Sequence, residues 1–199
     1  MISFGGDNAL KARLQANIDR HLKADTLVKG MTGQDGKGCS VWCSAGYYDH
    51  ARAAEEYLLP EWLWRLNDTL FEGMTASDAL QFPAQLWAAI PVGVDLEPVQ
   101  WRLAIARHKR QLEHRAEWAE PYVSRVVNCL NMTIKYFELL LSGADAAEAA
   151  QSAAWSAAQS AAWSARAAAR AAAWSAGAYY EWEAGTLLRL LKEEASRAF

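Results

Sequence analysis

The octapeptide AQSAAWSA occupies residues 150–157 and repeats without interruption at residues 158–165, and a further WSA follows at residues 174–176. Alanine makes up 19 of the 33 residues from position 144 to position 176, and neither glycine nor proline interrupts this stretch. Because alanine loses no side-chain entropy when a helix forms, it has the highest intrinsic helix propensity. The stretch therefore predicts a single helix in the C-terminal third of the chain, about 50 Å long at roughly 1.5 Å per residue.

Three tryptophans of this segment are spaced so that they would share one side of the predicted helix. Trp163 follows Trp155 by eight residues, and Trp174 follows Trp163 by eleven. At about 100° per residue, these steps turn the side chain by about 80° and about 20°. The resulting stripe of indoles suits either packing inside a helical bundle or docking of a partner or a second copy of the chain. Trp155, Trp163 and Trp174 are accordingly the predicted partner-binding residues.

Shorter segments with helical periodicity fill the rest of the chain. Apolar residues recur every four positions from Leu10 to Leu22, with Asp7 or Asn8 available as the N-cap. Pro60 suits the start of a helix over residues 61–73, and residues from Pro98 onward predict an exposed helix rich in cations. Residues 121–143 are apolar on several sides, which predicts the central helix of the core.

These patterns predict an all-α protein, an irregular helical bundle with a long alanine-rich C-terminal helix and a glycine- and cysteine-containing loop near the N-terminus. We expect residues 1–143 to form a helical domain. Residues 144–199 would add the Ala/Trp helix and a terminal helix, packed on the first part as one globular unit.

Composition excludes some classes of function. The chain of 199 residues has 20 basic and 23 acidic residues and a net charge of −3, so no strong positive field favours non-specific binding to nucleic acid or membranes. We expect no membrane-spanning segment, because no run of about 18 strongly apolar residues is present. The N-terminal sequence lacks the pattern of a secretory signal, and three cysteines fit a reducing compartment, so the expected location is cytoplasmic.

The loop GMTGQDGKGCSVWC, residues 30–43, is where the sequence offers chemistry. Its glycines could present backbone N–H groups and the Lys37 ammonium to an anion. The loop is not a P-loop of the Walker A type, because Lys37 is followed by Gly38 instead of serine or threonine. A plain turn is the alternative to an anion site.

Cysteine and histidine near this loop allow two further interpretations. Cys39, Cys43 and His50 could ligate a metal ion such as zinc, although no fourth ligand is evident. Cys39 with His50 and either Asp49 or Asp35 has the composition of a nucleophile, a base and an orienting group. Both cysteines could instead be small buried apolar residues.

Aromatic and cationic side chains follow closely after the loop. Stacking on aromatic rings together with phosphate contacts from lysine or arginine can hold a nucleotide. Aromatic packing in the core is the alternative. The predicted ligand-binding residues are Lys37, Trp42, Tyr47, Tyr48, His50 and Arg52.

Four segments in order resemble an uncharacterised family of bacterial, phage and prophage proteins. They are GKGCSVWC (36–43), YYDHARAAEEYLLPEWLWRLNDTLFEG (47–73), FPAQLWAAIPVGVDL (82–96) and the Ala/Trp/Ser repeats that follow. The family pattern is similar to GKGCxxxC, DHAR, IFEG and AIPVGxDL in that order, and the resemblance covers roughly residues 25–180. The family carries no established activity or assigned site residues.

The resemblance implies a phage or prophage protein, and small phage proteins without an enzyme signature often act by binding. By that analogy we expect a non-enzymatic binding protein, an antagonist of a bacterial defence system that binds a host defence protein or sequesters a small nucleotide signal. The alternatives are a small cysteine- or metal-dependent enzyme centred on Cys39, Cys43 and His50, and a structural homo-oligomer joined through the Ala/Trp helix. No cofactor is expected.

Overall fold

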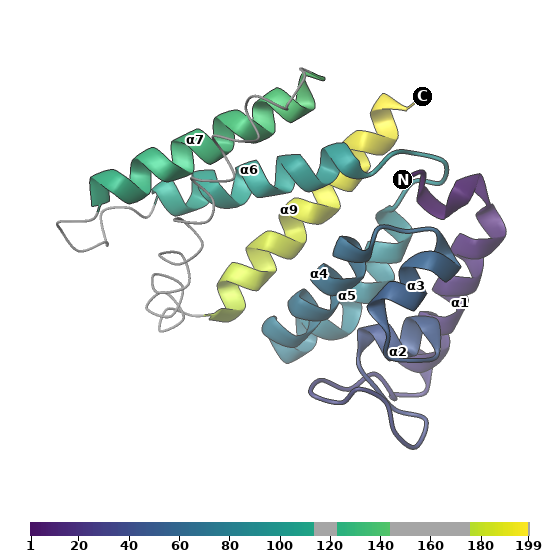
Figure 1. Cartoon of the computed structure of the whole chain (residues 1–199). Coiled ribbons are helices and arrows are strands. Elements are labelled where there is room, and N and C mark those ends of the chain that lie inside the picture. Colours follow the sequence, from purple (N-terminus) through teal and green to yellow (C-terminus); the bar gives the residue numbers. More distant parts are fainter. Residues whose placement is uncertain (114–122, 144–175, 199) are drawn as a thin grey trace. The chain divides into compact units, whose positions relative to one another are not determined.

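The computed structural model describes residues 1–113, 123–143 and 176–198, and Figure 1 shows the chain as a ribbon. These residues form helices joined by turns, with three isolated β-bridges and no strand among them. The prediction of an all-α protein is confirmed. The alanine-rich segment 144–175, with Trp155, Trp163 and Trp174, lies outside the described residues, so its helix and its tryptophan stripe stay predictions.

Contacts divide the chain into two compact units. The first unit contains Met1–Glu97 and Ala176–Phe199, and the second contains Pro98–Ser175. The C-terminal helix therefore belongs with the N-terminal half of the chain. The predicted division at residue 143 stays a prediction, because most of its second part is not described.

The helices of the first unit begin and end largely where local sequence signals place them. The 3-10 helix η1 covers Ser3–Gly6, and the α-helices are α1 (Asn8–Lys23), α2 (Ser40–Ala45), α3 (His50–Tyr57), α4 (Glu61–Gly73), α5 (Ala76–Ala89) and α9 (Ala176–Arg197). The Asp7 carboxylate accepts a hydrogen bond from the Ala9 N–H at 2.7 Å, and Asp49 accepts one from the Arg52 N–H at 3.0 Å. These side chains cap α1 and α3, as the sequence predicts for Asp7. Helix α2 was not expected, because it lies inside the glycine-rich stretch.

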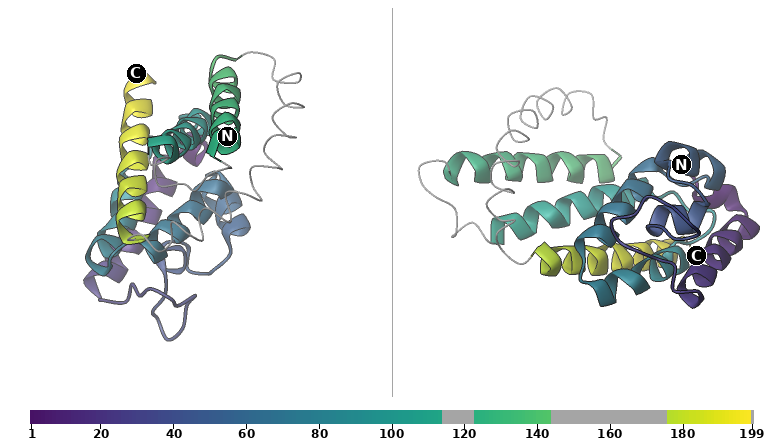
Figure 2. Two further views of the ribbon diagram at one scale, coloured as in Figure 1. Left: turned by 90° about the vertical axis from the view of Figure 1, so that its left-hand side faces the viewer. Right: turned by 90° about the horizontal axis from the view of Figure 1, so that it is seen from below.

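The core of the first unit is built around α4. This helix contacts α2, α3, α5 and α9, and Figures 1 and 2 show α4 and α5 side by side with α9. Trp64 of α4 and Trp87 of α5 are fully buried, with ring centroids 4.8 Å apart, and Tyr57 of α3 lies 5.6 Å from Trp64. The Trp87 indole N–H donates to the Ser44 hydroxyl at 2.8 Å, which ties α5 to α2. This hydrogen bond thus fixes the orientation of the Trp87 ring within an apolar core.

The second unit contains most of α6 (Glu97–Glu113) and α7 (Val123–Leu141). The Phe137 ring of α7 stacks on Trp101 and on His108 of α6, with centroids 5.4 and 6.0 Å apart. The prediction of an exposed helix is wrong for α6, because Val99, Leu103 and Ile105 on it are buried. The prediction that α7 is the hub of the core stays a prediction, because residues 114–122 and 144–175 on either side of it lie outside the described residues.

Replacement of Trp87 by phenylalanine tests the polar link in the core. We expect Trp87→Phe to lower the free energy of unfolding by about 1–3 kcal/mol, because the buried Ser44 hydroxyl loses its donor and part of the ring volume is lost. Urea unfolding followed by circular dichroism measures the effect. Trp62→Phe, at a half-buried position of α4, is the matched control, and an equal loss in both variants would contradict the assignment.

Candidate functional site

The connection between α1 and α2 is an ordered loop with a tight antiparallel turn at Gln34–Lys37 and a parallel bridge between Leu27 and Gly38 at its base. We call residues 29–38 of this loop the hairpin. Gln34 and Lys37 exchange two backbone hydrogen bonds, at 2.8 and 2.9 Å. The two residues between them, Asp35 and Gly36, have φ angles of 52° and 77°, the left-handed pair that a type I′ turn requires. At the base of the hairpin, the Val28 N–H donates to the Gly38 carbonyl at 2.8 Å. The Asp-Gly pair therefore fixes the conformation of the tip.

The Trp42 indole packs beneath this hairpin. A Cβ atom added to Gly33 would lie 2.1 Å from Trp42 Cδ1, and one added to Gly38 would lie 2.9 Å from Trp42 Cε3. The ring also meets His21 of α1 edge-on, with centroids 5.4 Å apart. Only glycine leaves room for this contact, so Trp42 supports the hairpin. Its predicted role in ligand binding stays a prediction.

The hairpin is braced against the last turn of α4. The Lys29 ammonium donates to the Met74 carbonyl at 2.5 Å, and the Gly30 N–H donates to the Glu72 carboxylate at 2.8 Å. Glu72 and Met74 were not expected from the sequence to take part in the loop. The fold brings them there because α4 ends beside the point where the hairpin leaves the body of the unit.

Several backbone donors in and next to the hairpin are occupied by acceptors of the chain itself. The N–H groups of Gly30, Gln34, Lys37, Gly38 and Cys39 all donate to carbonyl or carboxylate oxygens. An anion cradle of the expected kind needs such N–H groups to point at the ligand. What the hairpin presents to solvent is the tip, where all four residues from Gln34 to Lys37 are exposed.

Both cysteines of the loop region are buried. Burial raises the pKa of the Cys39 thiol to about 11, although the backbone N–H groups of Trp42 and Val41 act in the opposite direction and Asp68 adds to the shift. Burial raises the pKa of Cys43 to about 12, and its Sγ lies 3.3 Å from the Gly38 carbonyl oxygen. Protonated thiols are poor nucleophiles and poor metal ligands.

The predicted ligand set Cys39, Cys43 and His50 is not assembled in the structure. Among residues 1–113, 123–143 and 176–198, no group of three or more histidine, cysteine, aspartate or glutamate side chains could hold a metal ion. His50 instead faces Asp68 of α4, with Nε2 3.4 Å from the carboxylate oxygen. Neither Asp49, which caps α3, nor Asp35, at the hairpin tip, is the partner of His50.

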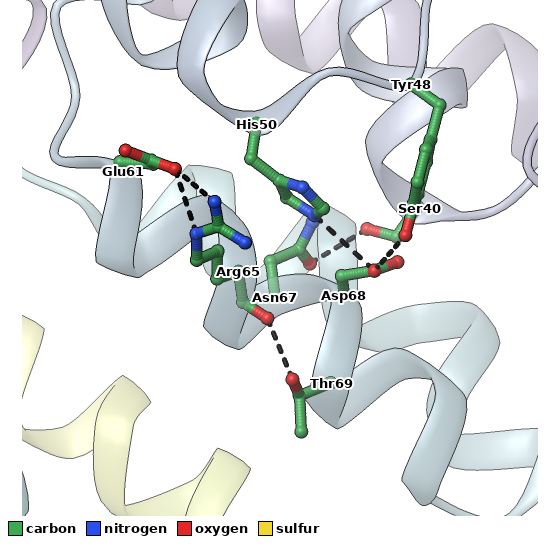
Figure 3. A network of polar contacts seen from close by, with 8 residues as sticks. All are labelled: Ser40, Tyr48, His50, Glu61, Arg65, Asn67, Asp68 and Thr69. Atoms are coloured by element: carbon green, nitrogen blue, oxygen red, sulfur yellow. Dashed lines mark hydrogen bonds and ion pairs between the residues drawn. The ribbon is translucent and has the colours of Figure 1, made fainter.

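Figure 3 shows the polar network that surrounds His50. The Tyr48 hydroxyl donates to the same Asp68 carboxylate at 2.7 Å, and the Tyr48 and His50 rings meet edge-on at 5.1 Å. Beside them, the Ser40 hydroxyl donates to the Asn67 side-chain oxygen at 2.8 Å, and both residues are fully buried. This hydrogen bond joins the start of α2 to α4. Asp68 and Asn67 follow each other in α4, so one helix turn organises the network.

A second pair of predicted residues forms its own network. The Arg52 guanidinium lies 4.0 Å from the centroid of the Tyr47 ring, and the Tyr47 hydroxyl donates to Glu56 at 2.6 Å. Arg13 of α1 also pairs with Glu56 at 2.8 Å. The structure thus brings Tyr47 together with Arg52, and Tyr48 together with His50, while Lys37 lies in the hairpin and Trp42 of α2 lies beneath it.

Acidic residues complete the Tyr47 and His50 networks and also hold the hairpin, and they were not predicted from the sequence. Asp68 and Glu72 stand four residues apart in EWLWRLNDTLFEG, and Glu56 stands four residues after Arg52. These spacings place each pair on one helix face. The partners of Glu56, which are Tyr47 and Arg13, nevertheless lie outside α3, and those of Asp68 and Glu72 lie outside α4, so identifying them required the fold.

Comparisons with known proteins add no identity. No family model, no curated protein and no solved structure matches the chain. The resemblance to a phage and prophage family stays a prediction. None of the described helices combines the length and the apolar character needed to cross a membrane.

Alkylation tests the state of the two loop thiols. At pH 8, a thiol with a pKa of about 11 is ionised in roughly one molecule in a thousand, so we expect iodoacetamide to modify Cys39 and Cys43 at least about a hundredfold more slowly in the native protein than in urea. Peptide mass spectrometry gives the rate at each site. Fast native labelling of Cys39 would restore the nucleophile interpretation.

Alkaline pH should destabilise the fold. The pKa is raised for Cys39 and Cys43, mainly by burial, and for Tyr48 to about 12, mainly by its hydrogen bond to Asp68. Because the folded state favours the neutral groups, their contribution is complete below the ordinary values of 9.0 and 10.0 and is lost as the pH rises toward 11–12. We expect the free energy of unfolding from urea titrations to fall over this range. The fall should be shallower in Cys39→Ala/Cys43→Ala, and an identical fall would contradict the thiol contribution.

Proposed function

We propose that this chain is a non-enzymatic binding protein and that the hairpin of residues 29–38 is its recognition element for a protein partner. The observation that carries the proposal is the bracing of this hairpin. Its tip is closed by two backbone hydrogen bonds between Gln34 and Lys37, its base is tied to α4 through Lys29 and Gly30, and Trp42 lies beneath it. A loop held in this way loses little conformational entropy on binding.

Exposed side chains at the tip supply the contact surface. Gln34, Asp35 and Lys37 are exposed, and their side chains have no part in the bracing of the hairpin. Lys37 contributes a positive charge and Asp35 a negative one, which favours a partner with a mixed polar surface over a polyanion. Function carried by a loop on a rigid helical scaffold is common, because the loop can vary without loss of the core.

The kind of partner rests on the family resemblance. Since that resemblance is to phage and prophage proteins, we propose a protein of a bacterial defence system as the target and a cytoplasmic site of action. The nucleotide-sequestering version has less support. The guanidinium of Arg52 already lies on Tyr47, and Tyr48 and His50 already engage Asp68, so a nucleotide would have to displace these contacts.

Site-specific photo-crosslinking tests the proposal. We expect p-benzoyl-phenylalanine at position 35 to give a single heavier adduct in a bacterial lysate, whereas the same group at the exposed position 196 of α9 gives none. The captured protein is then purified, and the adduct must form again from the two pure components. Equal adducts from both positions, or none from position 35, would count against the hairpin as the recognition element.

A glycine variant connects the adduct to the bracing of the hairpin. Gly33→Ala places a methyl group where the Trp42 ring lies, so we expect it to abolish the position-35 adduct while circular dichroism shows the helices intact. Native mass spectrometry with cyclic nucleotides addresses the other version. A one-to-one complex that is lost in Arg52→Ala and Lys37→Ala would replace the protein partner by a nucleotide.

A further inference from the structure

We infer that Tyr180, in the first turns of the C-terminal helix α9, is a positioning residue for the recognition hairpin and acts through the last turn of α4. This inference rests on the proposed function, since it concerns what holds the same hairpin in place. The connection runs between segments that are about 150 residues apart in the sequence. It lies entirely within the first compact unit.

The α4–α5 junction has contacts on two sides. Two hydrogen bonds attach the hairpin to it. The Lys29 ammonium donates to the Met74 carbonyl at 2.5 Å, and the Gly30 N–H donates to the Glu72 carboxylate at 2.8 Å. Between these two anchors lies Gly73, the last residue of α4. The acceptors that hold the hairpin are therefore the immediate neighbours of a single glycine.

The other side of this glycine is covered by α9. A Cβ atom added to Gly73 would lie 2.2 Å from Cδ2 and 2.4 Å from Cε2 of Tyr180, so the tyrosine ring rests directly on the glycine backbone. One turn earlier in α9, Gly177 packs near Thr75, with 3.4 Å from its added Cβ to Thr75 Cγ2. The first turns of α9 thus pack on residues 73–75, the segment next to the acceptors that hold the hairpin.

Packing on both sides explains how a helix at the end of the chain acts on a loop near its start. Met74 is buried, and its N–H continues the α4 hydrogen-bond ladder to Leu70 at 3.0 Å. If the Tyr180 ring is removed, the backbone at Gly73 loses its cover, and the carbonyl and carboxylate on either side of it lose their fixed position. Energetic coupling through packed side chains and rigid elements takes this form.

Hydrogen exchange of individual amides by NMR tests the inference on the intact chain without a partner. In Tyr180→Ala we expect exchange of the Gly30 amide, which donates to Glu72, to accelerate by about tenfold or more relative to the amides of α1. Tyr180→Phe keeps the ring atoms that touch Gly73 and should restore the protection. A loss of protection spread evenly over the unit would show a merely structural role and overturn the inference.

Two glycine variants test the same contact from its other side. Gly73→Ala inserts a methyl group into the contact with Tyr180, so it should reproduce the faster Gly30 exchange even if Tyr180→Ala fails to fold. Gly185→Ala, at an exposed position of α9 with nothing within 4 Å of the added Cβ, is the matched control and should leave Gly30 unchanged. Unchanged Gly30 exchange in Gly73→Ala would also overturn the inference.

The two proposals fail in different ways. Faster Gly30 exchange in Tyr180→Ala together with no adduct from position 35 of the unaltered hairpin would uphold the positioning by Tyr180 and reject the binding function. An adduct from position 35 that persists in Tyr180→Ala, with unchanged Gly30 exchange, would uphold the binding function and reject the positioning.

Discussion

Burial of α4 on several sides is the constraint on which the first unit depends. Its buried positions are Leu63, Trp64, Leu66, Asn67, Leu70 and Phe71, and its neighbours are α2, α3, α5 and α9. Each large apolar side chain that such a helix buries fully stabilises the fold by about 1.5–3 kcal/mol of transfer free energy. The polar groups that it carries into this environment must then find partners within the chain. The Ser40–Asn67 and Tyr48–Asp68 hydrogen bonds follow this rule, whereas the Trp64 indole nitrogen and the Asn67 amide nitrogen are buried without a hydrogen-bond partner among the described residues.

The helices and their boundaries could be predicted to the extent that they follow local rules. Asp7 caps α1, Pro60 precedes α4 and Gly73 ends it, because capping, the missing proline N–H and the helix C-terminus act within a few residues. Pro83 lies inside α5 without ending it, although proline in a helix interior removes a backbone hydrogen bond. Tertiary packing overrides local propensity here, because Phe82 and Leu86, on the face that carries the buried residues of α5, anchor the helix in the core.

The candidate site could be predicted only in part. Residue types in the Gly/Cys loop suggested phosphate, zinc or thiol chemistry, and each suggestion depended on which groups stay unpaired in the fold. Composition does not show that the Glu72 carboxylate accepts a hydrogen bond from the Gly30 N–H, or that Asp68 accepts one from Tyr48. It also does not show that burial keeps both thiols protonated. An Asp-Gly pair, by contrast, was a readable signal for the type I′ turn, because its conformational requirement is local.

Internal pairing also decides which ligands the hairpin suits. A phosphate that used the Gly30 N–H would have to displace the Glu72 carboxylate, and the freed carboxylate would remain nearby as a like charge. A protein that contacts Gln34, Asp35 and Lys37 breaks no such bond, because these side chains are exposed at the tip. The hydrogen bond from Gly30 to Glu72 therefore works against a small anion at the base of the hairpin, whereas contact with the side chains of the tip leaves this bond intact. The proposed recognition by a pre-organised loop and the pairing of the Gly30 N–H within the chain follow from one arrangement.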